Sequence, residues 1–200
     1  MRRNYFNKPV YRDGIYIGYT DGSVSPYNEL VPGLTPEGIV LKYSNIRGRE
    51  AIMLHPRNFV GAWGTLDRIP ELPGLHYEEY WQYGKENTEA IIASGYAGSA
   101  FDAIRSLGNQ WYMPESSIIT FLRGREGFKT ALDLIGGDDF NLYYQYVSTT
   151  VRAKTAGFDV VLFVNYMYWT GGEWSTSWKY SYLGDEFGVR AIRDFDFPKV

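Results

Sequence analysis

Residues 159–182 read DVVLFVNYMYWTGGEWSTSWKYSY, and the fold expected for the chain is built around this stretch. Its first part, 159–164, is the most apolar run of the chain and predicts a central strand covered on both faces. Thr170-Gly171-Gly172-Glu173 is typical of a hairpin turn. In the strand expected after this turn, alternate residues share one face. That face would carry Trp174, Thr176, Trp178, Tyr180 and Tyr182.

Two helical regions are expected upstream of this hairpin. The first runs from a cap at Asn87-Thr88 to Gly108, and Gly95 and Gly98 are the points where it could break. The second starts after Pro114, is interrupted at a glycine, and ends before residue 138.

Short strands are expected on both sides of the helical regions, at 16–19, 38–41, 51–54 and 187–195, and Asp21-Gly22 is typical of the turn after the first of them. The order of strands, helices and strands favours an α+β fold with small, mainly antiparallel sheets. We expect residues 1–13 to form an N-terminal arm and residues 14–200 to form a single domain.

Composition limits the classes of function. The net charge of −3 gives no electrostatic basis for binding nucleic acid. The absence of cysteine excludes disulfides, thiolate nucleophiles and cysteine-based metal sites. No window approaches the roughly 18 apolar residues of a spanning helix, so no membrane insertion is expected. The N-terminus lacks the apolar run of a signal peptide, which favours a virion protein or a domain of a longer exported protein.

The sequence contains no recognisable motif for catalysis or metal binding. His55 and His76 are not at a metal-binding spacing, and His55-Pro56 is typical of a structural loop. Asp138-Asp139 could supply oxygens to calcium, but a turn leading into a strand is the favoured interpretation. We therefore expect no catalytic residue, no metal site and no cofactor.

Aromatic residues are the unusual feature of this chain, which contains 18 Tyr. Residues 164–184 carry four of these Tyr and three Trp but only two charges, Glu173 and Lys179. These rings could face a core, as on one face of a half-buried strand. They could also form a recognition surface, because Tyr and Trp give large contact area at low entropic cost. Both interpretations remain open, since alternate residues of one strand serve opposite faces. The candidate ligand-binding residues are Tyr144, Tyr146, Asn165, Tyr166, Tyr168, Trp169, Glu173, Trp174, Trp178, Tyr180 and Tyr182.

Several short elements occur in an order that resembles a known family. They are Gly18-Tyr19-Thr20-Asp21-Gly22-Ser23, Gly38-Ile39-Val40, Gly84-Lys85-Glu86-Asn87-Thr88, Trp111-Tyr112-Met113-Pro114, Ala131-Leu132-Asp133-Leu134-Ile135-Gly136-Gly137 and Val189-Arg190-Ala191-Ile192-Arg193-Asp194-Phe195. In this order they resemble the C-type-lectin-fold domain of Bacteroidetes surface and phage proteins. Some members are variable targets of diversity-generating retroelements, and the collagen-like adhesin of Legionella looks related.

The resemblance implies two helices packed on small sheets, with the chain termini close together. It also implies that the variable, ligand-binding surface lies within residues 144–187. Val147 and Val151 stand where members of the family usually have Trp and Glu. The resemblance therefore does not fix how residues 146–165 align with the family. Formylglycine-generating enzymes share this fold, but their cysteines are absent here. The motifs of calcium-dependent sugar binding are also absent.

The resemblance and the aromatic segment together suggest a non-catalytic recognition domain on an extracellular surface or virion. Its partner would be a cell-surface protein or glycan, and homo-oligomers are possible. One alternative is a glycan-active enzyme that uses Glu173 and Asp185. The other is a structural subunit of a surface fibre. Arg190 and Arg193 are expected to tie down the last strand through Asp185, Glu186 or Asp194.

Overall fold

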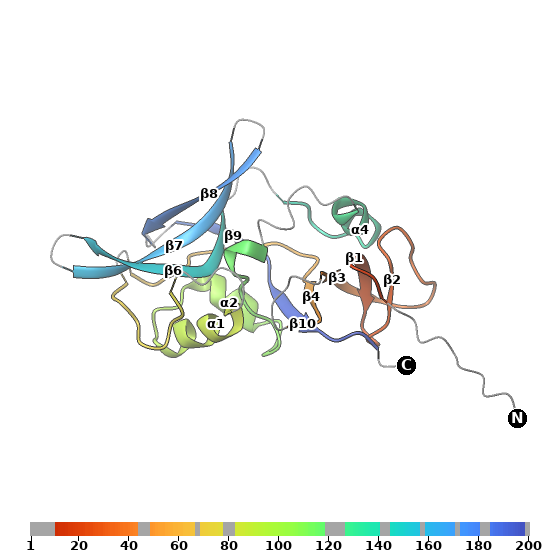
Figure 1. The fold of residues 1–200 in the computed structure, drawn as a ribbon, viewed down its shortest axis with the longest axis horizontal. Coiled ribbons are helices and arrows are strands. Elements are labelled where there is room, and N and C mark those ends of the chain that lie inside the picture. Colours follow the sequence, from red (N-terminus) through yellow and green to blue (C-terminus); the bar gives the residue numbers. More distant parts are fainter. Residues whose placement is uncertain are drawn as a thin grey trace, which may run out of the picture.

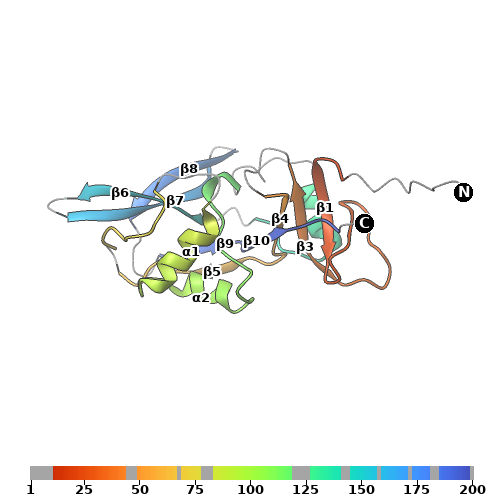
Figure 2. The same cartoon turned by 60° about the horizontal axis from the view of Figure 1, so that its bottom comes forward.

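The computed structural model describes residues 11–43, 49–66, 69–77, 83–118, 127–140, 145–156, 159–170, 173–180 and 185–198. These residues form an α+β fold with two five-stranded, mostly antiparallel sheets. The two sheets lie side by side along the long axis of the molecule (Figures 1 and 2).

The first sheet has the strand order β10-β4-β3-β1-β2. Its strands are β1 (Gly14–Tyr19), β2 (Val24–Pro26), β3 (Pro36–Lys42), β4 (Ala51–Leu54) and β10 (Ile192–Phe195). The expected turn at Asp21-Gly22 joins β1 to β2, and Gly22 has the positive φ of 83° that favours glycine.

Alternation along these strands places apolar residues on both faces of the first sheet. Ile39 and Leu41 pack with Phe128 and Leu132 of α4 (Phe128–Leu134), whereas Val40 faces a second core. Both faces are therefore buried, which explains why β3 and β4 are apolar at successive positions.

The second sheet has the strand order β5-β9-β6-β7-β8. Its strands are β5 (Phe59–Gly61), β6 (Tyr146–Ala156), β7 (Asp159–Thr170), β8 (Glu173–Tyr180) and β9 (Phe187–Val189). The sequence prediction of a hairpin is confirmed, because Thr170 pairs with Glu173. The run 159–164 belongs to β7, which lies between β6 and β8 as a central strand should. The expected cover on both faces is incomplete, because Phe163 is only half-buried.

Helices α1 (Gly84–Ala93) and α2 (Ser99–Arg105) occupy the first predicted helical region, and residues 94–98 between them are not helical. Gly95 has a φ of +78°, and a Cβ on Gly98 would collide with the Ala62 carbonyl oxygen. The interruption of the helix therefore lets the backbone approach residues 62–64 closely. It occurs at the glycines where the sequence predicted that the helix could break.

The predicted cap at Asn87-Thr88 is wrong, because α1 starts three residues earlier at Gly84. The Asn87 side chain instead donates to the backbone oxygens of His76 and Thr149 and accepts from the His76 amide. Thr88 donates to the Gly84 carbonyl oxygen. Asn87 therefore ties α1 to two distant segments, and Thr88 bonds within the helix.

The first and last described segments of the chain lie together. The ring of Tyr11 stacks on that of Phe197, with centroids 4.4 Å apart. Tyr11 therefore packs onto the fold, although the sequence assigned residues 1–13 to an arm. Residues 1–10 of that arm lie outside the described residues.

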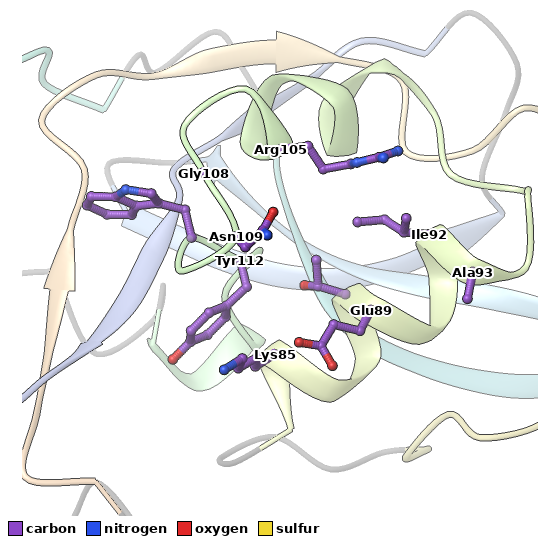
Figure 3. Close-up of a pocket in the computed structure, with 10 residues that line it drawn as sticks. Lys85, Glu89, Ile92, Ala93, Arg105, Gly108, Asn109 and Tyr112 are labelled. Atoms are coloured by element: carbon purple, nitrogen blue, oxygen red, sulfur yellow. The ribbon is translucent and has the colours of Figure 1, made fainter.

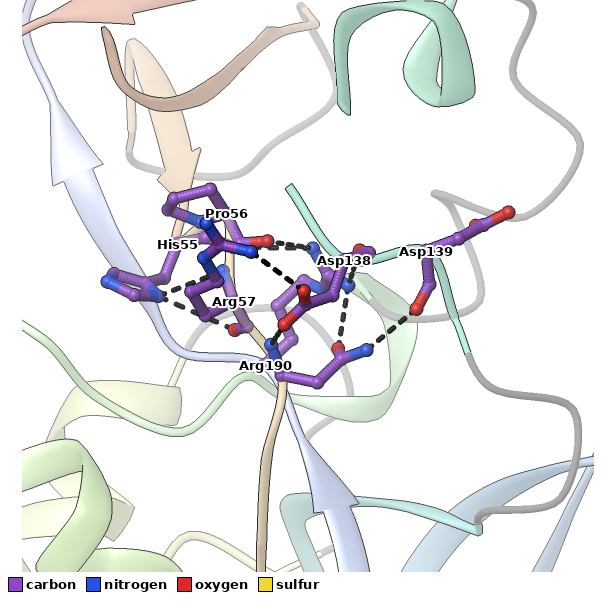
Figure 4. A network of polar contacts seen from close by, with 7 residues as sticks. His55, Pro56, Arg57, Asp138, Asp139 and Arg190 are labelled. Atoms are coloured by element: carbon purple, nitrogen blue, oxygen red, sulfur yellow. Dashed lines mark hydrogen bonds and ion pairs between the residues drawn. The ribbon is translucent and has the colours of Figure 1, made fainter. Parts of the chain in front are cut away.

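Arg190 lies where the chain passes from the second sheet into the first, between β9 and β10 (Figure 4). Its guanidinium donates to Asn58 Oδ1 at 2.6 Å and to the carbonyl oxygens of His55, Pro56 and Asp138. Burial lowers the pKa of Arg190 to about 10, so the group stays charged at neutral pH.

The expectation that Arg190 and Arg193 are structural agrees with these contacts, but the expected partners are wrong. Arg190 binds mainly carbonyl oxygens from two distant loops, and Arg193 pairs with Glu37 at 2.6 Å. Local sequence spacing suggested neighbouring carboxylates, whereas the tertiary fold brings partners from residues 37, 55–58 and 138.

His55 packs against Trp111, with ring centroids 5.1 Å apart, and its Nδ1 accepts a hydrogen bond from the Arg57 amide. Burial, reinforced by the nearby charge of Arg190, lowers the pKa of His55 below its usual 6.5. The unfolded chain therefore binds a proton near pH 6.5 more readily than the folded chain does.

We expect the free energy of unfolding to fall as the pH drops from about 7.5 through 6.5, and the fall to end below the folded pKa. Urea denaturation at a series of pH values measures this fall, and the matched variant is His55→Asn. An equal slope in the variant would assign the effect to other groups.

Candidate functional site

Strands β6, β7 and β8 form the platform on which the sequence places its candidate ligand-binding residues. They are 11, 12 and 8 residues long, and α1 and α2 lie against one face of this part of the sheet (Figure 1). On that face Val147, Val151 and Tyr166 join the core that contains Ile91 of α1.

The opposite face, here called the outer face, is defined by the cross-strand pairs of the register. Arg152 of β6 pairs with Phe163 of β7, and Asn165 of β7 pairs with Trp178 of β8. Directly opposed residues share a face, as do alternate residues of one strand. The outer face therefore carries Arg152, Phe163, Asn165 and Trp178, and at its other end Met167 with its partner Tyr146, where Phe140 packs against both.

Arg152 and the two rings form a contact cluster on the outer face. The guanidinium carbon of Arg152 lies 4.4 Å from the Trp178 ring centroid and 5.7 Å from that of Phe163. All three side chains are half-buried. Arg152 Nε is shielded from solvent and has no hydrogen-bond partner within the described protein. A cation beside two aromatic rings suits a ligand that offers an apolar surface and hydrogen-bond acceptors.

Asn165 of β7 is the cross-strand partner of Trp178 and is only 3% exposed. Its side-chain Oδ1 is shielded from solvent and has no hydrogen-bond partner in the described structure. Its backbone oxygen accepts a hydrogen bond from the Ser148 hydroxyl at 3.0 Å. Asn165 is thus part of the floor of the outer face rather than an exposed contact.

Tyr146 is a core residue, which corrects its prediction as a ligand contact. It is 1% exposed, and its ring meets Phe140 edge-on with centroids 4.8 Å apart. Gly188 on neighbouring β9 leaves room for this ring, because a Cβ there would lie 2.8 Å from it. The residues around Tyr146 do not indicate that the distant ring of Phe140 covers it.

Tyr166 and Tyr168 lie on the face of β7 opposite to the outer face. Their ring centroids are 5.5 Å apart, and Tyr166 also lies 6.5 Å from Phe187. The fold therefore divides the predicted residues between two faces and does not gather them into one surface.

The structure describes only the backbone of Trp169, Glu173, Trp174 and Tyr180, and Tyr144 and Tyr182 lie outside the described residues. The register pairs Trp169 with Trp174 and Phe163 with Tyr180.

Arg152 and Phe163 were not among the predicted site residues, although both belong to the outer face. Phe163 stood inside an apolar run that indicated a core strand. Arg152 lies two strands away from Trp178 in the sheet, so no local spacing linked them. The only signal in the sequence that could have placed Arg152, Phe163 and Trp178 on one face was the alternation of side chains along each of their strands.

A separate cavity of about 350 Å³ lies between α1, α2 and residues 108–112 (Figure 3). Lys85 and Glu89 reach it from α1 beside Tyr112, and Arg105 reaches it from α2. Its size is at the lower end of small-ligand sites. The Tyr112 hydroxyl donates to Asp194 at 2.6 Å, and burial raises the pKa of Tyr112. This hydroxyl is therefore not suited to proton transfer near neutral pH.

The acidic pair Asp138-Asp139 already has partners within the protein. Asp138 accepts hydrogen bonds from Arg57 and from the Asn58 amide, and Asp139 lies 3.3 Å from the Lys129 ammonium. Across the described residues there is no cluster of three His, Asp or Glu side chains placed to hold a metal ion. None of the described helices is long and apolar enough to cross a membrane.

Comparison of the chain with protein-family models, with curated proteins and with solved structures gave no significant match.

Proposed function

We propose that this chain is a non-catalytic recognition domain that binds a cell-surface protein or glycan through the outer face of β6, β7 and β8. The observation that carries the proposal is the cluster of Arg152, Phe163 and Trp178, in which the guanidinium lies 4.4 Å from the Trp178 ring centroid. Arg and Trp are the residue types that most often dominate binding surfaces.

The shape of this platform supports the same proposal. The β-sheet is backed by α1 and α2, so the rings of the outer face lose little entropy when a ligand binds. Sugar rings present apolar faces that can stack on Trp, together with hydroxyls that can accept hydrogen bonds from Arg. A protein surface with exposed carboxylates and apolar side chains would fit the same cluster.

We further propose that the fold is of the C-type-lectin type, of the kind found in retroelement-diversified surface and phage proteins. Three features support this proposal. The described ends of the chain meet at Tyr11 and Phe197, the helices precede the long hairpin of β7 and β8, and the last strand β10 returns to the first sheet. A domain of this type would act on an extracellular surface or virion.

Replacing Trp178 by Ala should weaken binding to the recognised glycan or cell surface roughly thirtyfold, because an aromatic anchor contributes about 2 kcal/mol. Arg152→Ala should weaken it as well, since it removes the cation of the same cluster. The measurement is binding to glycan arrays and to intact cells, followed by titration of the best ligand.

The matched control is Leu134→Ala, which removes an exposed apolar side chain from α4, outside the platform. It should leave binding unchanged. All three variants should keep the wild-type melting temperature to within a few degrees. Unchanged binding in both Trp178→Ala and Arg152→Ala would refute the assignment of the outer face, and a large drop in melting temperature would identify the cluster as core.

A further inference from the structure

Strand β8 is an edge strand within the described structure. The second sheet ends at β8, which pairs with β7 along its whole length, and no other described strand pairs with it. In Figure 1 it lies at the top of the molecule, whereas α1 and α2 lie at the bottom. An edge of eight residues offers a row of backbone N–H and C=O groups to another strand.

The sequence of this edge is complementary to itself. Residues 173–179 read Glu-Trp-Ser-Thr-Ser-Trp-Lys, with Thr176 at the centre. When the segment is laid antiparallel to a second copy about Thr176, Glu173 stands opposite Lys179 at both ends. Trp174 stands opposite Trp178, and Ser175 stands opposite Ser177.

We propose that β8 pairs antiparallel with β8 of a second copy of this chain, about a two-fold axis at Thr176. The two sheets would then join edge to edge into one continuous sheet. Opposite charges, aromatic pairs and hydroxyl pairs are the cross-strand combinations that stabilise antiparallel strands. A two-fold axis produces each of them twice, because residue i meets residue j and residue j meets residue i.

The backbone geometry is compatible with this register. Alternate residues of an edge strand direct their N–H and C=O groups outward. In an antiparallel pair, two residues that stand opposite each other must therefore both direct these groups outward or both direct them inward. The proposed pairs 173–179, 174–178 and 175–177 each join residues of equal parity, so this condition is met. The exposed side chain of Thr176 stands at the axis, where a β-branched residue suits a strand.

Charge complementarity argues for a second copy rather than an unrelated strand. Glu173 and Lys179 are the only charges of β8, and they stand at equal distances on either side of Thr176. In one chain they are about 20 Å apart along the strand, too far for an ion pair with each other. The two residues can pair with each other only between two chains.

The consequence for the outer face is that two copies would form one surface. A two-fold axis perpendicular to the sheet keeps equivalent faces on the same side. The cluster of Arg152, Phe163 and Trp178 from each chain would therefore look in the same direction. Two linked sites raise the apparent affinity for a repetitive ligand without any new contact. The pairing itself needs no ligand, so its test is independent of the recognition function.

Sedimentation of the purified chain from about 1 µM to about 1 mM should show a monomer–dimer equilibrium. Glu173→Lys and Lys179→Glu each place like charges opposite one another at both ends. Each variant should weaken dimerisation about tenfold or more. The double variant, Glu173→Lys with Lys179→Glu, restores opposite charges and should recover the wild-type dissociation constant.

Mixing the two single variants provides the sharpest test. In a mixed dimer one strand carries lysine at both ends and the other carries glutamate at both ends, so opposite charges meet twice. Heterodimers should therefore form at concentrations where each variant alone stays monomeric, and circular dichroism checks that both variants fold.

Two results would contradict the proposal. A wild-type chain that remains monomeric over the whole concentration range would overturn the pairing and leave the edge to a different partner. Equal dimerisation of all variants, or no recovery in the double variant and the mixture, would overturn the register.

Discussion

Replacing Arg190 by Met is expected to lower the free energy of unfolding by about 3 kcal/mol or more. Arg190 is 2% exposed, and its guanidinium is the common donor to His55, Pro56, Asn58 and Asp138 (Figure 4). Met fills much of the same space but donates no hydrogen bond. The substitution therefore leaves several partly buried oxygens unpaired, which costs more than the bonds themselves contributed.

Two variants make this expectation specific. Arg190→Lys keeps the charge but cannot reproduce the planar fork, so it should recover only part of the stability. Arg193→Met removes one ion pair, with Glu37, and should cost about 1 kcal/mol. Urea denaturation followed by circular dichroism measures all three. If Arg190→Met and Arg193→Met lower the free energy of unfolding equally, the hydrogen bonds of Arg190 do not have the special role in stabilising the connection between the two sheets that we assign to them.

Replacing Trp63 by Ala is expected to cost about 3–5 kcal/mol, the range for large aromatic residues in a core. Trp63 is fully buried, and its ring meets Phe101 of α2 edge-on with centroids 5.5 Å apart. Its indole Nε1 donates to the Ser148 carbonyl oxygen of β6 at 3.1 Å. One side chain therefore joins a helix to the strand that carries Arg152.

Trp63→Phe separates the two contributions. It keeps most of the apolar volume and loses the hydrogen bond to Ser148, so it should cost clearly less than Trp63→Ala. The control is Leu66→Ala, three residues after Trp63 in the chain, where the leucine side chain is 44% exposed. It should change the free energy of unfolding by about 0.5 kcal/mol or less. Thermal and urea denaturation give the ranking. A Trp63→Ala variant as stable as Leu66→Ala would contradict the packing described here.

Several elements of the fold could be predicted from local sequence. The alternating and apolar runs identified β3, β4 and β7, and the Asp21-Gly22 and Gly171-Gly172 dipeptides identified the hairpins that β1 and β7 begin. The α+β class followed from the order of these elements. The start of α1 could not be predicted, because Asn87 reaches Thr149 instead of capping the helix. Glycines marked where the chain could break, but contact between Gly98 and distant Ala62 decided that it does.

Local sequence is enough to predict the hairpins and the principal strands, and it contains the self-complementary order of residues 173–179, because turn chemistry and side-chain alternation act within a few residues. The packing of distant segments makes β8 an edge strand, buries Tyr146, brings Arg190 to the loops at 55–58 and 138, and places Arg152 beside Trp178. Burial and pairing depend on which distant segments meet. Neighbouring residues do not contain that information, because a side chain's partners are fixed only when separate strands and helices pack together.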